Sequence, residues 1–276
     1  MNGPLRGHAS GLGGGYDAWA EADAYEPYVG RWSRLVATRF LDWIDADAGL
    51  DWLDAGCGTG ALAHAITRES APRRVAGIDR SAAYAAAARA QAPDGRAAFA
   101  VGDAAALPLR TGCVDVAVSG LVLNFVPDPA AMVGELARVV RSGGTVALYV
   151  WDYAEGMELM RHLWDAAVEL DPAAAGLDEG RRFPICAPQP LRLLFVDAGL
   201  SDVDARAIDV PTVFRDFDDF WRPFLGGQGP APGYVMSLDE DRRAALREAV
   251  RGRLPAAPDG TIRLQARVWA AKGRVQ

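Results

Sequence analysis

The segment Asp54–Gly60 (DAGCGTG) carries the residues best suited to bind a ligand, because it lies between a predicted strand and a predicted helix. Its glycines allow a tight turn and a close approach to a ligand that a Cβ would exclude. A dinucleotide site would have the spacing G-x-G-x-x-G, with a pyrophosphate at the helix start. Here the spacing is G-x-G-x-G, and a carboxylate precedes it. That carboxylate favours a ligand with an ammonium group, such as S-adenosylmethionine (SAM), over NAD or a turn without a ligand.

Two further acidic residues follow predicted strands. Asp79 ends the second strand, 19 residues after Gly60, where a carboxylate can accept hydrogen bonds from two ribose hydroxyls. The alternative for Asp79 is a helix N-cap, for which Ser81 is the better candidate. After the third strand, Asp103 is placed to contact an adenine amino group and the N–H of Ala104 a ring nitrogen, although alone this segment indicates only a turn.

Strands and helices alternate between residues 50 and 151. This rhythm predicts a parallel sheet covered on both faces, with right-handed crossovers, and hence a Rossmann-like doubly wound α/β fold. Gly143 and Gly144 are expected to close the turn after the third helix. The predicted strands are Leu50–Ala55, Arg74–Asp79, Ala97–Val101, Val114–Ser119 and Thr145–Trp151, and the helices are Gly60–Glu69, Ser81–Gln91 and Pro129–Val140.

Flanking segments extend this core to a predicted seven-stranded, mostly parallel sheet with a helical cap. Residues 1–15 and 226–233 are of low complexity and are expected to be mobile. The aromatic residues of 214–224 recur at spacings of three and four, which favours a packed amphipathic helix. The predicted flanking helices are Ala20–Ile44, Glu155–Leu170, Pro190–Ala198 and Asp239–Arg253, and the strands are Val203–Val213 and Thr261–Ala271.

The chain resembles the class I SAM-dependent methyltransferases of the small-molecule type, close to the methyltransferase type 11 group. The resemblance covers residues 15–155 well and rests on Asp54–Gly60, Gly77–Asp79, Gly102–Pro108, Asp115-Val116 and Leu136–Gly144. It implies SAM as methyl donor, S-adenosylhomocysteine as product, and an antiparallel last strand, Thr261–Ala271. The predicted cofactor-binding residues are Tyr28, Arg31, Asp54, Gly56, Cys57, Gly58, Asp79, Arg80, Asp103, Ala104 and Ser119.

Catalytic residues are harder to predict, because in-line transfer from a sulfonium depends mainly on alignment and exclusion of water. Asn124 follows the fourth strand and could orient a substrate or the methionine end of SAM, or could simply cap a helix or a turn. Asp152 and Tyr153 leave the fifth strand as candidates for a base or a hydrogen-bonding group. His162 is the most plausible histidine base, but a histidine at the edge of the core is the simpler interpretation.

The aromatic N-terminal block has two interpretations of equal weight. Its aromatic residues could cover the cofactor and the substrate as a lid, with Arg31 pairing with the methionine carboxylate. Alternatively, the block is a helix that packs its aromatic side chains on the core. The residues concerned are Tyr16, Trp19, Tyr25 and Tyr28.

Length and composition place these features in one domain. The 276 residues are 50% hydrophobic, and the net charge of −7 disfavours nucleic-acid substrates. The three cysteines lack metal-site spacing, so no metal is expected. Since no signal peptide or membrane span is evident, we expect a soluble cytoplasmic monomer or homodimer. The predicted parts are a flexible leader (1–15) and one domain (16–276) with a helical lid (16–49), a SAM-binding core (50–152), a cap (153–200) and C-terminal strands and helices (201–276).

The sequence therefore predicts methyl transfer from SAM to the oxygen, nitrogen or carbon of an apolar or aromatic small molecule. The alternative is a regulatory protein that binds SAM or a nucleoside without catalysis. A nucleic-acid methyltransferase is disfavoured, since the segment after the fourth strand lacks the Asn/Asp-Pro-Pro-Tyr/Phe motif. No recognisable feature supports methylation of protein arginine or lysine.

Overall fold

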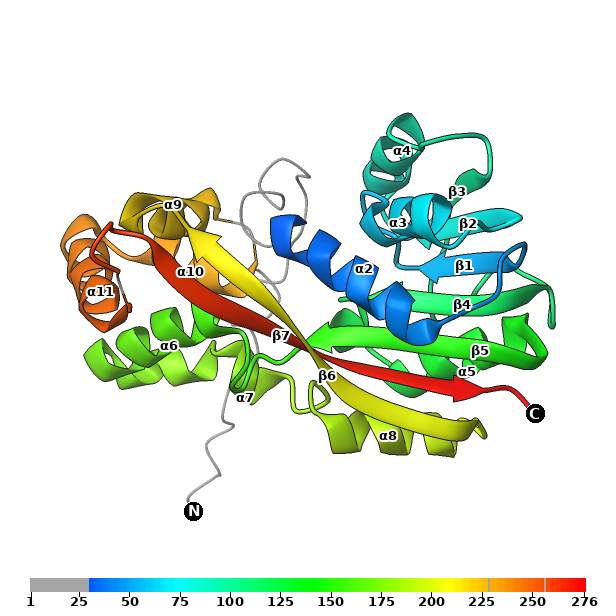
Figure 1. Cartoon of the computed structure of the whole chain (residues 1–276). Coiled ribbons are helices and arrows are strands. Elements are labelled where there is room, and N and C mark those ends of the chain that lie inside the picture. The colour runs from blue at the N-terminus through cyan, green and yellow to red at the C-terminus, as the bar shows by residue number, and fades with distance from the viewer. Residues whose placement is uncertain (1–29, 228, 256) are drawn as a thin grey trace, which may run out of the picture.

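The computed structural model describes residues 30–227, 229–255 and 257–276, which form one seven-stranded sheet with helices on both faces (Figure 1). The strand order is β3-β2-β1-β4-β5-β7-β6. Six strands run in the same direction, and β7 is antiparallel to both of its neighbours. This confirms the predicted doubly wound sheet with an antiparallel last strand. The strands are β1 (Asp51–Ala55), β2 (Arg74–Asp79), β3 (Ala97–Val101), β4 (Val114–Gly120), β5 (Val140–Trp151), β6 (Ser201–Phe214) and β7 (Ile262–Arg274).

Helices cover the two faces of the sheet. On one face lie α2 (Arg31–Ile44), α3 (Ala61–Glu69) and α4 (Ala82–Ala90), and on the other α5 (Pro129–Val139) and α8 (Pro188–Asp197) (Figure 1). All five residues of β1 are buried between these layers, as expected for a central parallel strand. None of the helices in the described part of the chain has the length and apolar character needed to span a membrane.

Side-chain caps fix where several helices begin. Ser81 Oγ accepts a hydrogen bond from the N–H of Tyr84 (3.2 Å), which confirms Ser81 as the N-cap of α4. Asp128 caps α5 in the same way, and Pro129 occupies its first turn. The short helices η2 (Leu123–Phe125), η3 (Pro172–Gly176) and η4 (Arg222–Gly226) connect the longer elements.

A helical cap is assembled at the far end of the β6–β7 ribbon. The pairing of β5 with β7 ends at Trp151 and Val268, so the remaining residues of β7 pair with β6, apart from one bridge between Ala266 and Met157, and extend past the sheet (Figure 1). The backbone of Arg267 holds the segment before α6 through hydrogen bonds with Asp152 and Gly156, both 2.9 Å long. The cap helices are α6 (Glu158–Leu170), α7 (Glu179–Arg182), α9 (Phe217–Trp221), α10 (Pro230–Ser237) and α11 (Glu240–Arg253).

Two local predictions were wrong. Gly143 and Gly144 belong to β5 instead of ending a turn, because the N–H of Gly143 donates to the carbonyl of Val275 and the carbonyl of Gly144 accepts from the N–H of Val275. Gly143 still has a φ of 79°, which favours glycine. Of the segment 226–233, which was expected to be mobile, residues 230–233 instead begin α10, whose first three residues are buried. There the Tyr234 ring packs on Trp164 of α6, with ring centroids 5.3 Å apart.

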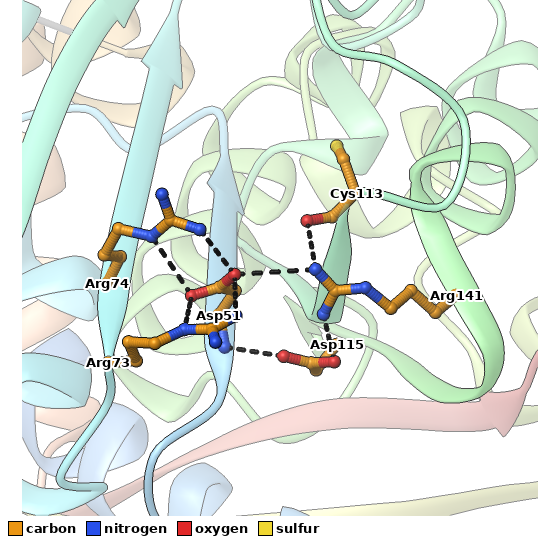
Figure 2. Close-up of polar contacts among 6 residues, drawn as sticks. All are labelled: Asp51, Arg73, Arg74, Cys113, Asp115 and Arg141. Carbon is orange, nitrogen blue, oxygen red and sulfur yellow. Dashed lines mark hydrogen bonds and ion pairs between the residues drawn. The ribbon is translucent and has the colours of Figure 1, made fainter.

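The amino ends of β1 and β4 are held by a network of charged side chains (Figure 2). The buried carboxylate of Asp51 accepts hydrogen bonds from Arg73 and Arg74. Arg141 pairs with Asp115, and its Nη2 lies 3.5 Å from Oδ2 of Asp51. These hydrogen bonds hold the pKa of Asp51 well below its usual range. Ion pairs therefore stabilise the end of the sheet that lies opposite the glycine loop.

Candidate active site

A cavity of about 560 Å³ lies at the carboxyl ends of the parallel strands, next to the point where the strand order reverses between β1 and β4. Doubly wound sheets bind ligands at this place, and the volume is typical of small-molecule sites. The core contributes the glycine loop and the residues after β2, β4 and β5, whereas the cap contributes side chains of α6, α7 and α10. The core residues in the wall include Asp54, Gly56, Cys57, Gly58, Asp79, Arg80, Tyr84, Val122, Phe125, Tyr149, Trp151 and Tyr153, and those of the cap are Met160, Glu179 and Pro230.

The glycine loop passes from β1 to α3 in a conformation that requires its glycines. Gly56, Gly58 and Gly60 have φ values of 76°, 53° and 91°, all in the left-handed region. A Cβ on Gly56 would also lie 2.5 Å from Cγ2 of Val122. The N–H groups of Gly56 and Cys57 donate to the carbonyl of Ile78, which fixes the loop against the end of β2. Burial raises the pKa of the Cys57 thiol, so this wall group is neutral.

Asp54 is the buried acidic group beneath this loop, with 1% of the residue exposed. Its Oδ2 accepts a hydrogen bond from the N–H of Ala63 (3.0 Å) in the first turn of α3. Its Oδ1 is buried and has no hydrogen-bond partner among the described residues. Burial raises the pKa of Asp54 to about 7, and the charge of Asp79 adds to the shift. The loop therefore holds a carboxyl group that lacks a partner for one oxygen.

Asp79 connects the end of β2 to the same loop. One carboxylate oxygen accepts from the N–H of Gly58 and the other from the N–H of Ser81, both at 2.8 Å. A carboxylate has about four acceptor positions, so two remain for ligand hydroxyls. Arg80 follows as an exposed wall residue. Burial raises the pKa of Tyr84, which also lies in the wall and was not predicted from the sequence.

Of the other predicted cofactor residues, four are described and lie outside the cavity wall, and a fifth is not described. Ser119 donates to the carbonyl of Ala55 (2.7 Å), which ties β4 to β1. Arg31 pairs with Asp219 at 3.5 Å and stacks on Trp32, with Cζ 4.2 Å from the ring centroid. Asp103 is exposed and accepts from the N–H of Ala105, next to the buried Ala104. Tyr28, like Tyr16, Trp19 and Tyr25 of the predicted lid, lies outside the described residues.

The structure does not bring the four catalytic candidates together. Among them, only Tyr153 is in the described wall of the cavity. Asp152 is buried in the turn before α6, where its Oδ1 accepts from the N–H of Glu155. Asn124 lies in η2, and its side-chain oxygen and nitrogen are buried without partners in the described part of the chain. His162 is on α6, and burial lowers its pKa. The roles of all four remain predictions.

Sequence reasoning missed Glu179, a carboxyl group that the cap places in the cavity wall. Only 1% of the residue is exposed, and the indole N–H of Trp164 donates to its Oε2. Burial raises the pKa of Glu179 to about 7. No signal in the sequence marked it, since it lies in a stretch rich in proline and glycine that resembles a connection between helices. Among the described residues, no group of three potential ligands is placed to hold a metal ion.

The fold and this site define the chain as a Rossmann-like protein with a ligand cavity at the switch point of its sheet. Residues 53–148 match the family model described as "Methyltransferase domain". A 2-methyl-6-phytyl-1,4-hydroquinone methyltransferase of Synechocystis is 31% identical over 253 residues, which cover 82% of this chain and 78% of the relative. The chain thus belongs to the class I SAM-dependent methyltransferases, whose methyl donor is SAM.

Other similarities are shorter or concern the fold alone. A malonyl-[acyl-carrier protein] O-methyltransferase of Pectobacterium atrosepticum is 36% identical over 138 residues, 48% of this chain and 53% of the relative. The chain spans about half the length of the first curated relatives it matches. A crystal structure of a putative methyltransferase from Bacillus halodurans has a TM-score of 0.58 at 15% identity, covering 86% of this chain and 97% of the other.

Proposed function

We propose that this chain transfers a methyl group from SAM to the oxygen, nitrogen or carbon of a small-molecule acceptor by in-line displacement. The observation that carries the proposal is Asp54, a wall residue at the glycine loop whose buried Oδ1 has no hydrogen-bond partner among the described residues. A buried carboxyl group without a partner costs free energy unless a ligand supplies one. The ammonium group of SAM is a donor of the right charge for this position.

The residues around Asp54 fit the rest of the donor. Asp79 keeps acceptor positions for the ribose hydroxyls, and Gly56 and Gly58 allow the ligand to approach the backbone. Asp103 and Ala104 are proposed to contact the adenine, as the family resemblance implies, from the end of β3. SAM supplies a methyl group on a positively charged sulfur that leaves as a neutral thioether.

The chain itself contributes alignment and a dry environment. Aromatic and apolar side chains after β4 and β5 and in the cap enclose the cavity, including Phe125, Trp151 and Met160. Such a wall holds an apolar acceptor and excludes water, so that nucleophile and methyl group can meet in line. The cap helices that reach the wall, α6 and α7 within the predicted cap (153–200) and α10 beyond it, would then select the acceptor.

Calorimetric titration of the purified protein with SAM and with S-adenosylhomocysteine tests the proposal. We expect saturable binding of both, weakened roughly tenfold to a hundredfold in Asp79→Asn, because hydrogen bonds to a charged group contribute about 1.5–3 kcal/mol. Asp94→Asn is the matched control, since Asp94 forms an exposed pair with Arg96 outside the cavity wall. If the folded protein binds neither ligand, the proposal is rejected.

An acceptor screen separates catalysis from binding alone. Formation of S-adenosylhomocysteine is followed with phenols, alcohols, amines and activated carbon acids as acceptors. Turnover with any class supports the enzyme. Binding of SAM without turnover across all classes would favour the alternative of a regulatory SAM-binding protein.

A further inference from the structure

The cap contributes one carboxyl group to the described cavity wall, that of Glu179. It lies on α7, far in the sequence from Asp54 and Asp79, which belong to the loop end of the cavity. One oxygen of Glu179 accepts the indole N–H of Trp164. Burial raises its pKa to about 7, so both the carboxylate and the carboxylic acid are populated at neutral pH. A group of this kind is suited to exchange a proton with a ligand.

The position of Glu179 is fixed by the residues around it. Asp178 is the N-cap of α7 and accepts from the N–H of Gly180 at 2.9 Å. Arg161 of α6 pairs with Asp178 at 2.9 Å and also donates to the carbonyl of Tyr153. Both partners of this ion pair are largely buried, with side chains 15% and 7% exposed. The pair therefore joins α7, α6 and the end of β5 and holds Glu179 in the wall.

The wall near the cap is otherwise apolar and aromatic. Trp151, Met160 and Pro230 line it together with Tyr153, whose ring packs on Phe183 with centroids 5.7 Å apart. The adjacent Asp178 pairs with Arg161, whereas the nearby positive charge that lowers the pKa of Glu179 is that of Arg182, a smaller effect than burial. The carboxylate form of Glu179 is costly in such surroundings even with the hydrogen bond from the Trp164 indole, and a ligand that donates a further hydrogen bond would stabilise it.

We propose that Glu179 binds the nucleophilic group of the acceptor and accepts its proton, so that the acceptor carries a hydroxyl or amine on an uncharged, mainly apolar body. This inference rests on the methyl transfer proposed above. As the acceptor oxygen or nitrogen forms its bond to the methyl carbon, the proton that this atom loses passes to a carboxylate oxygen of Glu179. The electron pair of the broken carbon–sulfur bond stays on sulfur, and Glu179 later releases the proton to water.

The charges of the wall exclude carboxylate acceptors. Its described acidic residues are Asp54, Asp79 and Glu179, and its only arginine or lysine in that part of the chain is the exposed Arg80. A substrate carboxylate would face Glu179 across an apolar space, where like charges repel strongly. This chain would then differ from the relative named for a malonyl substrate. A carbon nucleophile without a hydroxyl or amine would add no hydrogen bond to the one that Glu179 already accepts from the Trp164 indole.

Matched probes can test this in the complex with S-adenosylhomocysteine. We would titrate the complex with 4-propylphenol, 4-propylaniline, 4-propylanisole and 4-propylbenzoate, which share one apolar body, by ligand-observed NMR. The phenol and the aniline are expected to bind at least tenfold more tightly than the benzoate, and more tightly than the anisole, which has no proton to donate. In Glu179→Gln the ratio of phenol to benzoate affinity should fall to within threefold. Glu169→Gln is the matched control, because Glu169 is an exposed glutamate of the same cap.

The outcomes separate this role from the donor site. Absent binding of S-adenosylhomocysteine rejects methyl transfer and this inference together. If S-adenosylhomocysteine binds, the role of Glu179 alone is rejected by any of three results: equal affinities for phenol and benzoate, no binding of either protic probe, or the same ratio in Glu179→Gln as in the unaltered protein. Should Glu179→Gln not fold, Glu179→Asp, which withdraws the carboxylate by one methylene, should lower the ratio at least threefold, and an unchanged ratio would overturn the proposal.

Discussion

Asp51 and Asp54 are three residues apart on β1 and both are almost fully buried, yet their surroundings act on them in opposite directions. At the amino end of the strand, Asp51 accepts hydrogen bonds from Arg73 and Arg74, which hold its pKa well below the usual range (Figure 2). At the carboxyl end, Asp54 has one backbone donor, and burial raises its pKa to about 7.

The difference shows which end of the sheet serves stability and which serves binding. Asp51 meets its partners within the chain, so its charge is compensated when the protein folds. Asp54 keeps a buried oxygen without a partner in the described structure, so its charge is compensated only by a ligand. Since parallel strands present their carboxyl ends to ligands, this is the end where an unsatisfied group is useful.

The largest expected effect is that of Asp54→Asn on SAM binding. The amide keeps an acceptor for the N–H of Ala63 but loses the charge that an ammonium group would meet. We expect the dissociation constant to rise roughly 10- to 100-fold, as for the loss of a charged hydrogen bond of about 1.5–3 kcal/mol. The free energy of unfolding at pH 8, measured in urea without ligand, should not fall, because no buried charge is lost from a satisfied pair. A loss of stability without a change in SAM affinity would reverse the roles assigned to the two ends.

The pH dependence of SAM binding should follow the ionisation of Asp54. Its pKa is raised on folding, so the protein without ligand loses stability as pH rises from about 4 to about 7. A ligand that needs the carboxylate binds more tightly over the upper part of this range. The dissociation constant is expected to fall about tenfold between pH 6 and pH 8 in calorimetric titrations.

Two variants identify the group whose ionisation causes this pH dependence. Asp54→Asn should remove it, whereas Glu179→Gln should keep it, although the pKa of Glu179 is also raised to about 7 in the same cavity. Were the slope to survive in Asp54→Asn and vanish in Glu179→Gln, the titrating group would be Glu179, and Asp54 would not be the partner of the ammonium.

At the opposite end, Asp51→Asn should lower stability and leave SAM affinity within threefold of its original value. We expect a loss of about 1–2 kcal/mol in urea unfolding, less than for a fully buried pair, because the arginine side chains are more than half exposed and screened by solvent. The pKa of Asp51 is lowered on folding, so its contribution is present above about pH 4 and disappears as pH falls further. Equal stabilities of variant and original protein at pH 7 would show that the network is dispensable.

How far the sequence determines the fold depends on how local the determining contacts are. Arg74–Asp79 and Ala97–Val101 were predicted with their observed bounds, because a short apolar run with a turn on each side fixes a parallel strand locally. Gly143 and Gly144 were assigned to a turn, because their pairing with Val275 is not visible in the sequence around them. The helix α10 was missed for the same reason, since its packing partner Trp164 lies about 70 residues away.

The residues of the candidate site also differ in whether local spacing or packing between distant segments determines their positions. Asp54, Gly56 and Asp79 were found because the loop and the strand ends place them by local spacing, and all three are in the cavity wall. Glu179 reaches the wall only after α6 and α7 have packed and Arg161 has paired with Asp178. No spacing in the sequence indicates that ion pair. For this reason Glu179, at the acceptor end of the cavity, was not predicted, whereas the residues at the loop end were.

The smallest effect is expected for Ser119→Ala, at the second-last residue of β4. Ser119 was predicted to contact the cofactor from its place at the end of the fourth strand, but its buried hydroxyl donates to the carbonyl of Ala55, and the residue lies outside the described cavity wall. Removing this hydrogen bond should cost about 1 kcal/mol of stability and change SAM affinity less than twofold. Urea unfolding and calorimetry together measure both quantities. A tenfold loss of SAM affinity with unchanged stability would instead make Ser119 part of the donor site. The residues that bind SAM would then include one from β4 as well as Asp54 of β1.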